Sequence, residues 1–99
     1  MALRHWGFIY VAAGSDPGGE RTVVDTGDCT TVLVGVPDPA DGLRAARSLV
    51  GDGVQLIELC GAFGPVHAGA IIEAVGSAVP VGIVAYGPEA IDQLHAIFS

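Results

Sequence analysis

Aromatic residues alternate with smaller residues along positions 5–12, and this period of two is typical of a β-strand. The alternation places Trp6, Phe8 and Tyr10 on one face of this strand. Turn-forming residues fill positions 14–19 and predict a loop. The chain therefore begins with a strand that carries an aromatic stripe.

Two further strands follow. Positions 21–26 are short and polar enough for a strand at the edge of a sheet. After the turn at Gly27-Asp28, positions 30–36 form a continuous apolar run, which predicts a strand that is buried on both faces.

From position 37 onwards the pattern changes to alternating helix and strand. Asp38 suits the N-cap of a helix, and Pro39 suits its first position. Helical spacing of apolar residues predicts the faces that are buried in the later helices. In chain order we expect a helix that ends at Gly51, a strand over 54–60, a helix over 65–77 that buries Ile71, Ile72 and Val75, a strand over 81–86, and a helix over 88–98 that buries Ile91, Leu94 and Phe98.

The predicted order is βββαβαβα, within a single α/β domain over residues 1–99. Strands that are separated by helices lie parallel and are joined by right-handed crossovers. We expect a small, mixed, mainly parallel five-stranded sheet, with a three-stranded parallel core, an antiparallel edge and three helices that cover it. A ferredoxin-like sandwich fits less well, because it needs fewer helix–strand alternations.

Few charges are available to cover the surface. Hydrophobic residues make up 51% of the chain and charged residues only 15%, compared with roughly 25% in an ordinary soluble domain. Apolar surface that charges do not cover favours burial against another copy, so we expect a homo-oligomer. The alternative is a monomer whose hydropathy is raised by alanine and glycine.

The charge balance excludes several classes of function. The net charge is −7 and lysine is absent, so a nucleic-acid backbone would be repelled and binding to a membrane surface is disfavoured. No apolar run is long enough to cross a bilayer. The first residues lack the features of a signal peptide, so we expect a cytoplasmic protein with Cys29 and Cys60 as free thiols.

Cofactor motifs are also absent. The sequence contains neither a Walker loop nor the dinucleotide glycine fingerprint, and its Cys and His residues lack metal-ligand spacing. Without lysine, Schiff-base chemistry is excluded. We expect no cofactor and no metal.

Three similar loops follow the predicted parallel strands, at positions 35–39, 61–65 and 85–89. Ligands bind beyond the carboxyl ends of such strands, where helix N-termini offer free amides. The alternative is that Gly-Pro pairs only punctuate these loops. The expected ligand-binding residues are Pro37, Gly61, Phe63, Gly64 and Gly87, with Trp6 and Tyr10 from the aromatic stripe, unless that stripe is core.

Glu58 interrupts the apolar segment 55–60. A buried carboxylate costs several kcal/mol unless it is paired, hydrogen-bonded or protonated, and such groups cluster at functional sites. We therefore expect Glu58 to be shielded from solvent, as a catalytic acid or base. The alternative is a structural carboxylate bonded to amides or to an arginine.

Three other side chains could take part in the chemistry. Cys60 is a candidate nucleophile, although buried cysteines are usually inert. His67 lies in the first turn of a predicted helix and is the only base close to it in sequence. Tyr86 ends the last predicted strand and offers a phenol to the same edge.

Several segments resemble those of a known family. Positions 6–11, 34–37, 53–65 (GVQLIELCGAFGP) and 79–89 (VPVGIVAYGPE) are similar to those of bacterial proteins of about a hundred residues, a domain of unknown function. The resemblance implies a stand-alone domain and no established activity. Positions 53–65 are also similar to a strand and loop of (β/α)8 barrels, in which a carboxylate at a strand end does acid–base work.

Three functional hypotheses follow. The first is a cofactor-independent lyase, isomerase or cyclase that acts on a small organic molecule through Glu58, His67 and Tyr86. The second is a non-catalytic protein that binds or senses a small molecule in the same cavity. The third is an oligomeric scaffold. Converging carboxyl or imidazole groups would favour the enzyme, and an apolar cavity would favour the binding protein.

Overall fold

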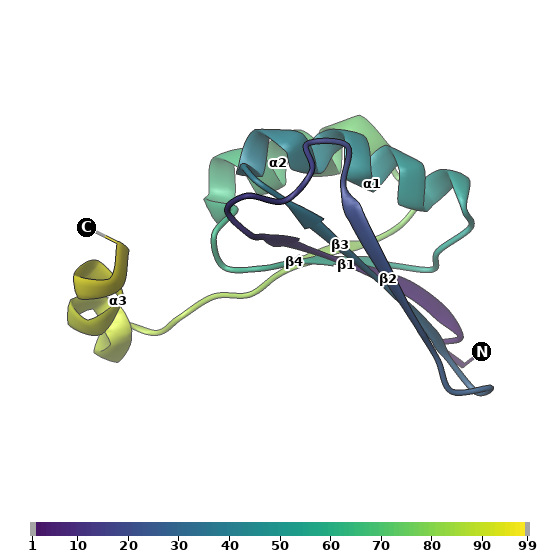
Figure 1. Ribbon diagram of the computed structural model, residues 1–99, viewed down its shortest axis with the longest axis horizontal. Coiled ribbons are helices and arrows are strands. Elements are labelled where there is room, and N and C mark those ends of the chain that lie inside the picture. Colours follow the sequence, from purple (N-terminus) through teal and green to yellow (C-terminus); the bar gives the residue numbers. More distant parts are fainter. Residues whose placement is uncertain (1, 99) are drawn as a thin grey trace.

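The computed structural model describes residues 2–98 of the chain. A five-stranded sheet forms its centre (Figure 1). The elements in chain order are β1 (His5–Val11), β2 (Glu20–Asp25), β3 (Thr30–Val36), the 3-10 turn η1 (Pro39–Asp41), α1 (Gly42–Gly51), β4 (Ile57–Leu59), α2 (Gly64–Val75), β5 (Val81–Ile83), the 3-10 turn η2 (Pro88–Ala90) and α3 (Ile91–Phe98).

The strands lie side by side in the order β2-β3-β1-β4-β5. β1 pairs in parallel with both β3 and β4, β5 is parallel to β4, and β2 is antiparallel to β3. A mixed, mainly parallel α/β fold is thus confirmed. The detail differs from the prediction, since β1 joins the parallel core as its central strand, and 3-10 turns precede α1 and α3.

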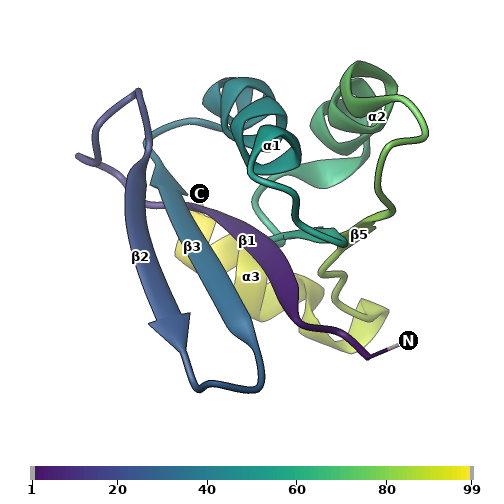
Figure 2. The ribbon, with the colours of Figure 1, turned by 90° about the vertical axis from the view of Figure 1, so that its right-hand side faces the viewer.

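α1 and α2 cover one face of the sheet (Figures 1 and 2). Gly7 of β1 lets α1 come close, because a Cβ at this position would lie 2.6 Å from Cδ1 of Leu49. The core lies between this face and the two helices. Its largest fully buried side chains are Phe63, Ile9, Leu49, Ile57, Leu59, Ile71, Val34 and Val36.

No described element covers the other face, which we call the open face (Figure 1). Trp6, Phe8 and Tyr10 form a ladder along it, with ring centroids 6.5 and 6.4 Å apart. Leu33 lies beside Phe8 and is only half-buried. The expectation that residues 30–36 are buried on both faces is therefore wrong, because the helices pack on one face alone.

α3 does not pack on the sheet. It stands beyond one end of the sheet, after an extended segment (Figure 1). Ile91 is 61% and Phe98 74% exposed, and Leu94 is half-buried. The expected burial of this helix is wrong, and two helices rather than three cover the sheet. Helical periodicity defines an apolar stripe, but it does not supply the surface that covers the stripe.

Local signals position the other elements. Asp38 accepts a hydrogen bond from the amide of Ala40 at 2.9 Å, which confirms the predicted N-cap before η1.

Ile71 is fully buried in α2, whereas Ile72 is 47% exposed, contrary to expectation. An ion pair of 2.6 Å between Arg21 and Asp52 links β2 to the end of α1.

The helices within residues 2–98 are all too short to cross a membrane.

Candidate functional site

A cavity of about 740 Å³ opens at the C-terminal ends of β1 and β4, beside α3. Strand ends and the loops after them supply most of its wall, and α3 supplies the remainder. The lining residues are Val11, Ala13, Cys60, Gly61, Ala62, Tyr86, Leu94 and Phe98.

Backbone hydrogen bonds place Cys60 in the cavity wall. Its amide donates to the carbonyl of Ile9 at 3.0 Å, which extends the pairing of β1 with β4 by one residue. The amide of Val11 then donates to Sγ of Cys60 at 3.3 Å. The thiol is therefore held against the end of β1.

Tyr86 reaches the cavity because Gly61 leaves room for its ring. A Cβ at Gly61 would lie 2.9 Å from Cε2 of Tyr86. The ring thus lies against the backbone of the loop after β4, although the residue is 62% exposed. Its phenol is the hydroxyl group in the cavity wall.

The lining is mainly apolar. Among its described residues, the polar side-chain groups are the Tyr86 hydroxyl and the Cys60 thiol, and none carries a carboxylate or an imidazole. Such a surface suits a small molecule with an apolar body that offers one or two hydrogen-bonding groups.

Three of the residues singled out from the sequence meet in this cavity, namely Cys60, Gly61 and Tyr86. Glu58 and His67 lie outside its lining. His67 is half-buried on α2. The structure therefore does not bring the proposed acid–base groups together in this cavity.

Glu58 is exposed, so the expectation that it is shielded from solvent is wrong. Ile57 and Leu59 face the helices and are buried, and the period of two along a strand turns Glu58 to the opposite, open face. There it pairs with Phe8 of β1, and its Cγ lies over Gly82 of β5.

Phe63 fills the core instead of facing the cavity. It is 2% exposed, and a Cβ at Gly42 would overlap its ring. Gly64, with a φ of 64°, begins α2 in a conformation that favours glycine. The other expected ligand-binding residues also lie outside the cavity lining: Pro37 follows β3, Gly87 precedes η2, and Trp6 and Tyr10 lie on the open face.

Sequence reasoning missed four of the lining residues, Val11, Ala13, Leu94 and Phe98, whereas Ala62 lies within the loop over 61–65 that it placed at the site. The run Ala12-Ala13-Gly14, directly after β1, was a usable signal, because small residues at a strand end leave space. The contribution of α3 could not be inferred, since its apolar residues were assigned to the core.

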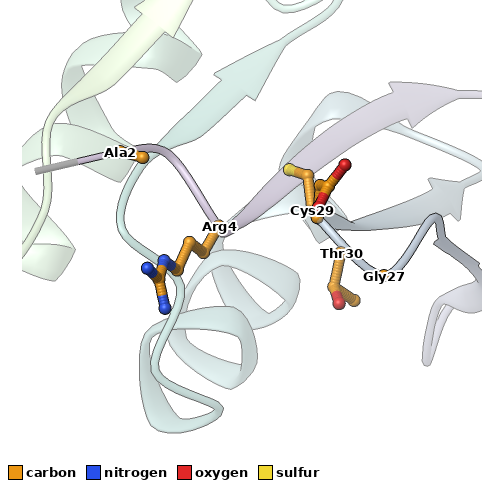
Figure 3. A pocket seen from close by; sticks show the side chains of 6 residues that line it. Ala2, Arg4, Gly27, Cys29 and Thr30 are labelled. Atoms are coloured by element: carbon orange, nitrogen blue, oxygen red, sulfur yellow. The ribbon is translucent and has the colours of Figure 1, made fainter.

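A second hollow, of about 490 Å³, lies at the opposite end of the strands. Arg4 and Thr30 border it, together with the turn between β2 and β3. The Arg4 side chain points away from Cys29 and Thr30 (Figure 3). Because its side chains do not converge, we assign the candidate site to the larger cavity.

Metal ligands are not clustered in the part of the chain that the structure describes. No group of three or more His, Cys, Asp or Glu residues there is arranged to hold an ion.

A family model matches residues 4–99 of the chain, and its description is a family of unknown function (DUF6506). Neither the curated proteins nor the solved structures yield a match.

Proposed function

Because this chain belongs to the DUF6506 family, whose description names no activity, we propose its function from the geometry of the cavity. The protein binds or senses a small, mainly apolar molecule at the C-terminal ends of β1 and β4. It does so without catalysis.

The composition of the cavity wall carries this proposal. Apolar side chains and glycine surround about 740 Å³ of space, a volume within the range of small-molecule sites. The Tyr86 hydroxyl can donate a hydrogen bond to a carbonyl or ether oxygen of the ligand. The apolar walls add to the free energy of binding, because they remove the apolar body of the ligand from water.

The acid–base hypothesis has less support. Proton transfer requires a positioned acid or base within about 3 Å of the reacting atom, and Glu58 and His67 do not line the cavity. The scaffold hypothesis has less support too, because the strand ends border an open cavity rather than a filled edge.

A thermal-shift screen of small, uncharged organic fragments tests the proposal. A ligand at one hundred times its Kd stabilises the folded state by about 2.7 kcal/mol, so the melting temperature rises clearly. The variant Ala62→Phe places a large ring in the cavity wall and should abolish this rise.

Ala70→Phe is the matched control, because Ala70 is exposed on α2 and outside the cavity. It should respond to the same fragments as the wild type does. Equal responses from Ala62→Phe and the wild type would place binding elsewhere and refute the proposal, as would a screen without hits.

A further inference from the structure

Two apolar surfaces of this chain lie without a covering element among the described residues. One is the open face, which carries the aromatic ladder of β1. The other is the segment 83–98, which we call the C-terminal arm and which ends in α3 (Figure 1). Neither surface takes part in the core.

The arm exposes about as much apolar surface as the largest patches found on monomers. Its large apolar residues that are 41–74% exposed are Ile83, Val84, Tyr86, Ile91, Ile97 and Phe98. Aromatic side chains such as Tyr86 and Phe98 carry roughly 150–250 Å² each and the aliphatic ones somewhat less, so the six together expose on the order of several hundred Å². This area is comparable to the largest patch on a typical monomer, about 300–600 Å².

Within α3 these residues form one stripe. Ile91, Leu94 and Phe98 follow a spacing of three and four, and Ile97 borders them. The polar side chains Asp92 and His95 lie outside the stripe. The helix is thus amphipathic, although most of its apolar side lies in solvent.

The open face offers a complementary surface. Trp6, Phe8 and Tyr10 run along its centre, with Leu33 beside Phe8. The Tyr10 ring lies against the backbone of Gly35. A Cβ at that glycine would come within 2.9 Å of the ring, so glycine leaves the space that the ring occupies. The ladder itself is uncharged, with Glu58 on its β4 side and Glu20 of the edge strand β2 beside Gly35.

We propose that a second copy of the chain covers both surfaces. The arm of each copy packs the side of α3 that bears Ile97, which lies outside the cavity lining, on the open face of the other, around a two-fold axis. One reciprocal contact then buries both surfaces at once. A standard interface takes about 800 Å² from each partner; the arm supplies much of this, and the half-buried rings of the ladder add to it.

The position of the arm favours the other copy over its own sheet. The extended segment after β5 carries α3 beyond the end of the sheet, away from α1 and α2 (Figures 1 and 2). Gly87 is itself extended, with φ −77° and ψ 169°, where η2 begins. The molecule is accordingly elongated, measuring 39 × 28 × 28 Å.

Light scattering combined with Trp6 fluorescence tests the proposal. Trp6 is the only tryptophan of the sequence and lies on the open face, so its emission reports directly on whether that face is covered. We expect twice the chain mass of 10.0 kDa and an emission typical of a shielded indole.

Two variants separate the two halves of the contact. Ile97→Glu places a charge on the arm, and Leu33→Glu places one on the open face; neither residue lines the cavity. Each should halve the mass and move the Trp6 emission to longer wavelength. Val66→Glu is the matched control, since Val66 is 81% exposed on α2, and it should stay dimeric.

Ile97 is 70% exposed and outside the core, so Ile97→Glu should retain the far-ultraviolet circular dichroism of the fold. A wild-type mass near 10 kDa with a shielded Trp6 would mean that the arm folds onto its own sheet, and would overturn the proposal. A monomer with an exposed Trp6 would overturn it as well. So would a dimer that survives Ile97→Glu.

Discussion

Gly42, the first residue of α1, shows how closely the two helices pack. A Cβ at this position would overlap the ring of Phe63, and it would also lie 3.2 Å from Cδ1 of Ile71. The backbone of Gly42 has ordinary helical angles, with φ −65° and ψ −28°. Space, and not backbone conformation, therefore requires glycine here.

Gly42→Ala should lower the free energy of unfolding by about 1–3 kcal/mol, because the added methyl group overpacks the core. The gain in helix propensity, up to about 1 kcal/mol, offsets this cost only in part. Urea denaturation measures the difference.

Gly69→Ala is the control for that substitution. Gly69 lies within α2, and a Cβ there would meet nothing within 4 Å. This variant should gain about 0.5–1 kcal/mol. Equal stability of the two alanine variants would show that the contact between Gly42 and Phe63 does not constrain the core.

Glu58 marks the limit of sequence reasoning at the scale of one residue. Its flanking apolar residues suggested a buried carboxylate, but the same three residues also fit a half-buried strand whose middle side chain faces outward. Only knowledge of which faces the helices cover distinguishes the two cases.

At the scale of elements, the start of α1 depends on a cap. Asp38 adopts an extended conformation, with φ −144° and ψ 145°, and its side chain satisfies the amide of Ala40. This bond precedes η1, which leads directly into α1.

Asp38→Ala should destabilise the chain by about 1 kcal/mol, whereas Asp38→Asn should be nearly neutral, because asparagine caps about as well as aspartate. Thermal or urea unfolding of both variants provides the comparison. A similar loss in both would indicate that the charge of Asp38, rather than its hydrogen bond, matters.

Most elements could be predicted from pattern and punctuation, including the edge position of β2 and the shared face of the aromatic stripe. β4 and β5 are shorter than predicted, with three residues each. Apolar runs indicate where a strand passes, whereas paired backbone groups define its length, and such pairing is not visible in one sequence.

At the scale of the whole molecule, the low charge content of 15% goes together with the apolar side chains that the arm exposes. The strand order was harder to infer. β2 is antiparallel to β3, but this pairing does not determine where β1 lies. Nothing in the sequence indicates that β1 inserts between β3 and β4. That insertion brings Val11 and Ala13 to the cavity, which explains why both were missed.

Binding in the cavity beside α3 is the central claim, and mapping of backbone amide resonances by NMR tests it most directly. A fragment from the thermal-shift screen is titrated into the isotope-labelled protein. The account predicts shifts at Cys60, Gly61 and Ala62 after β4 and at Tyr86, all of which line the cavity. Shifts confined to Gly27–Thr30, at the opposite end of the strands, would contradict it.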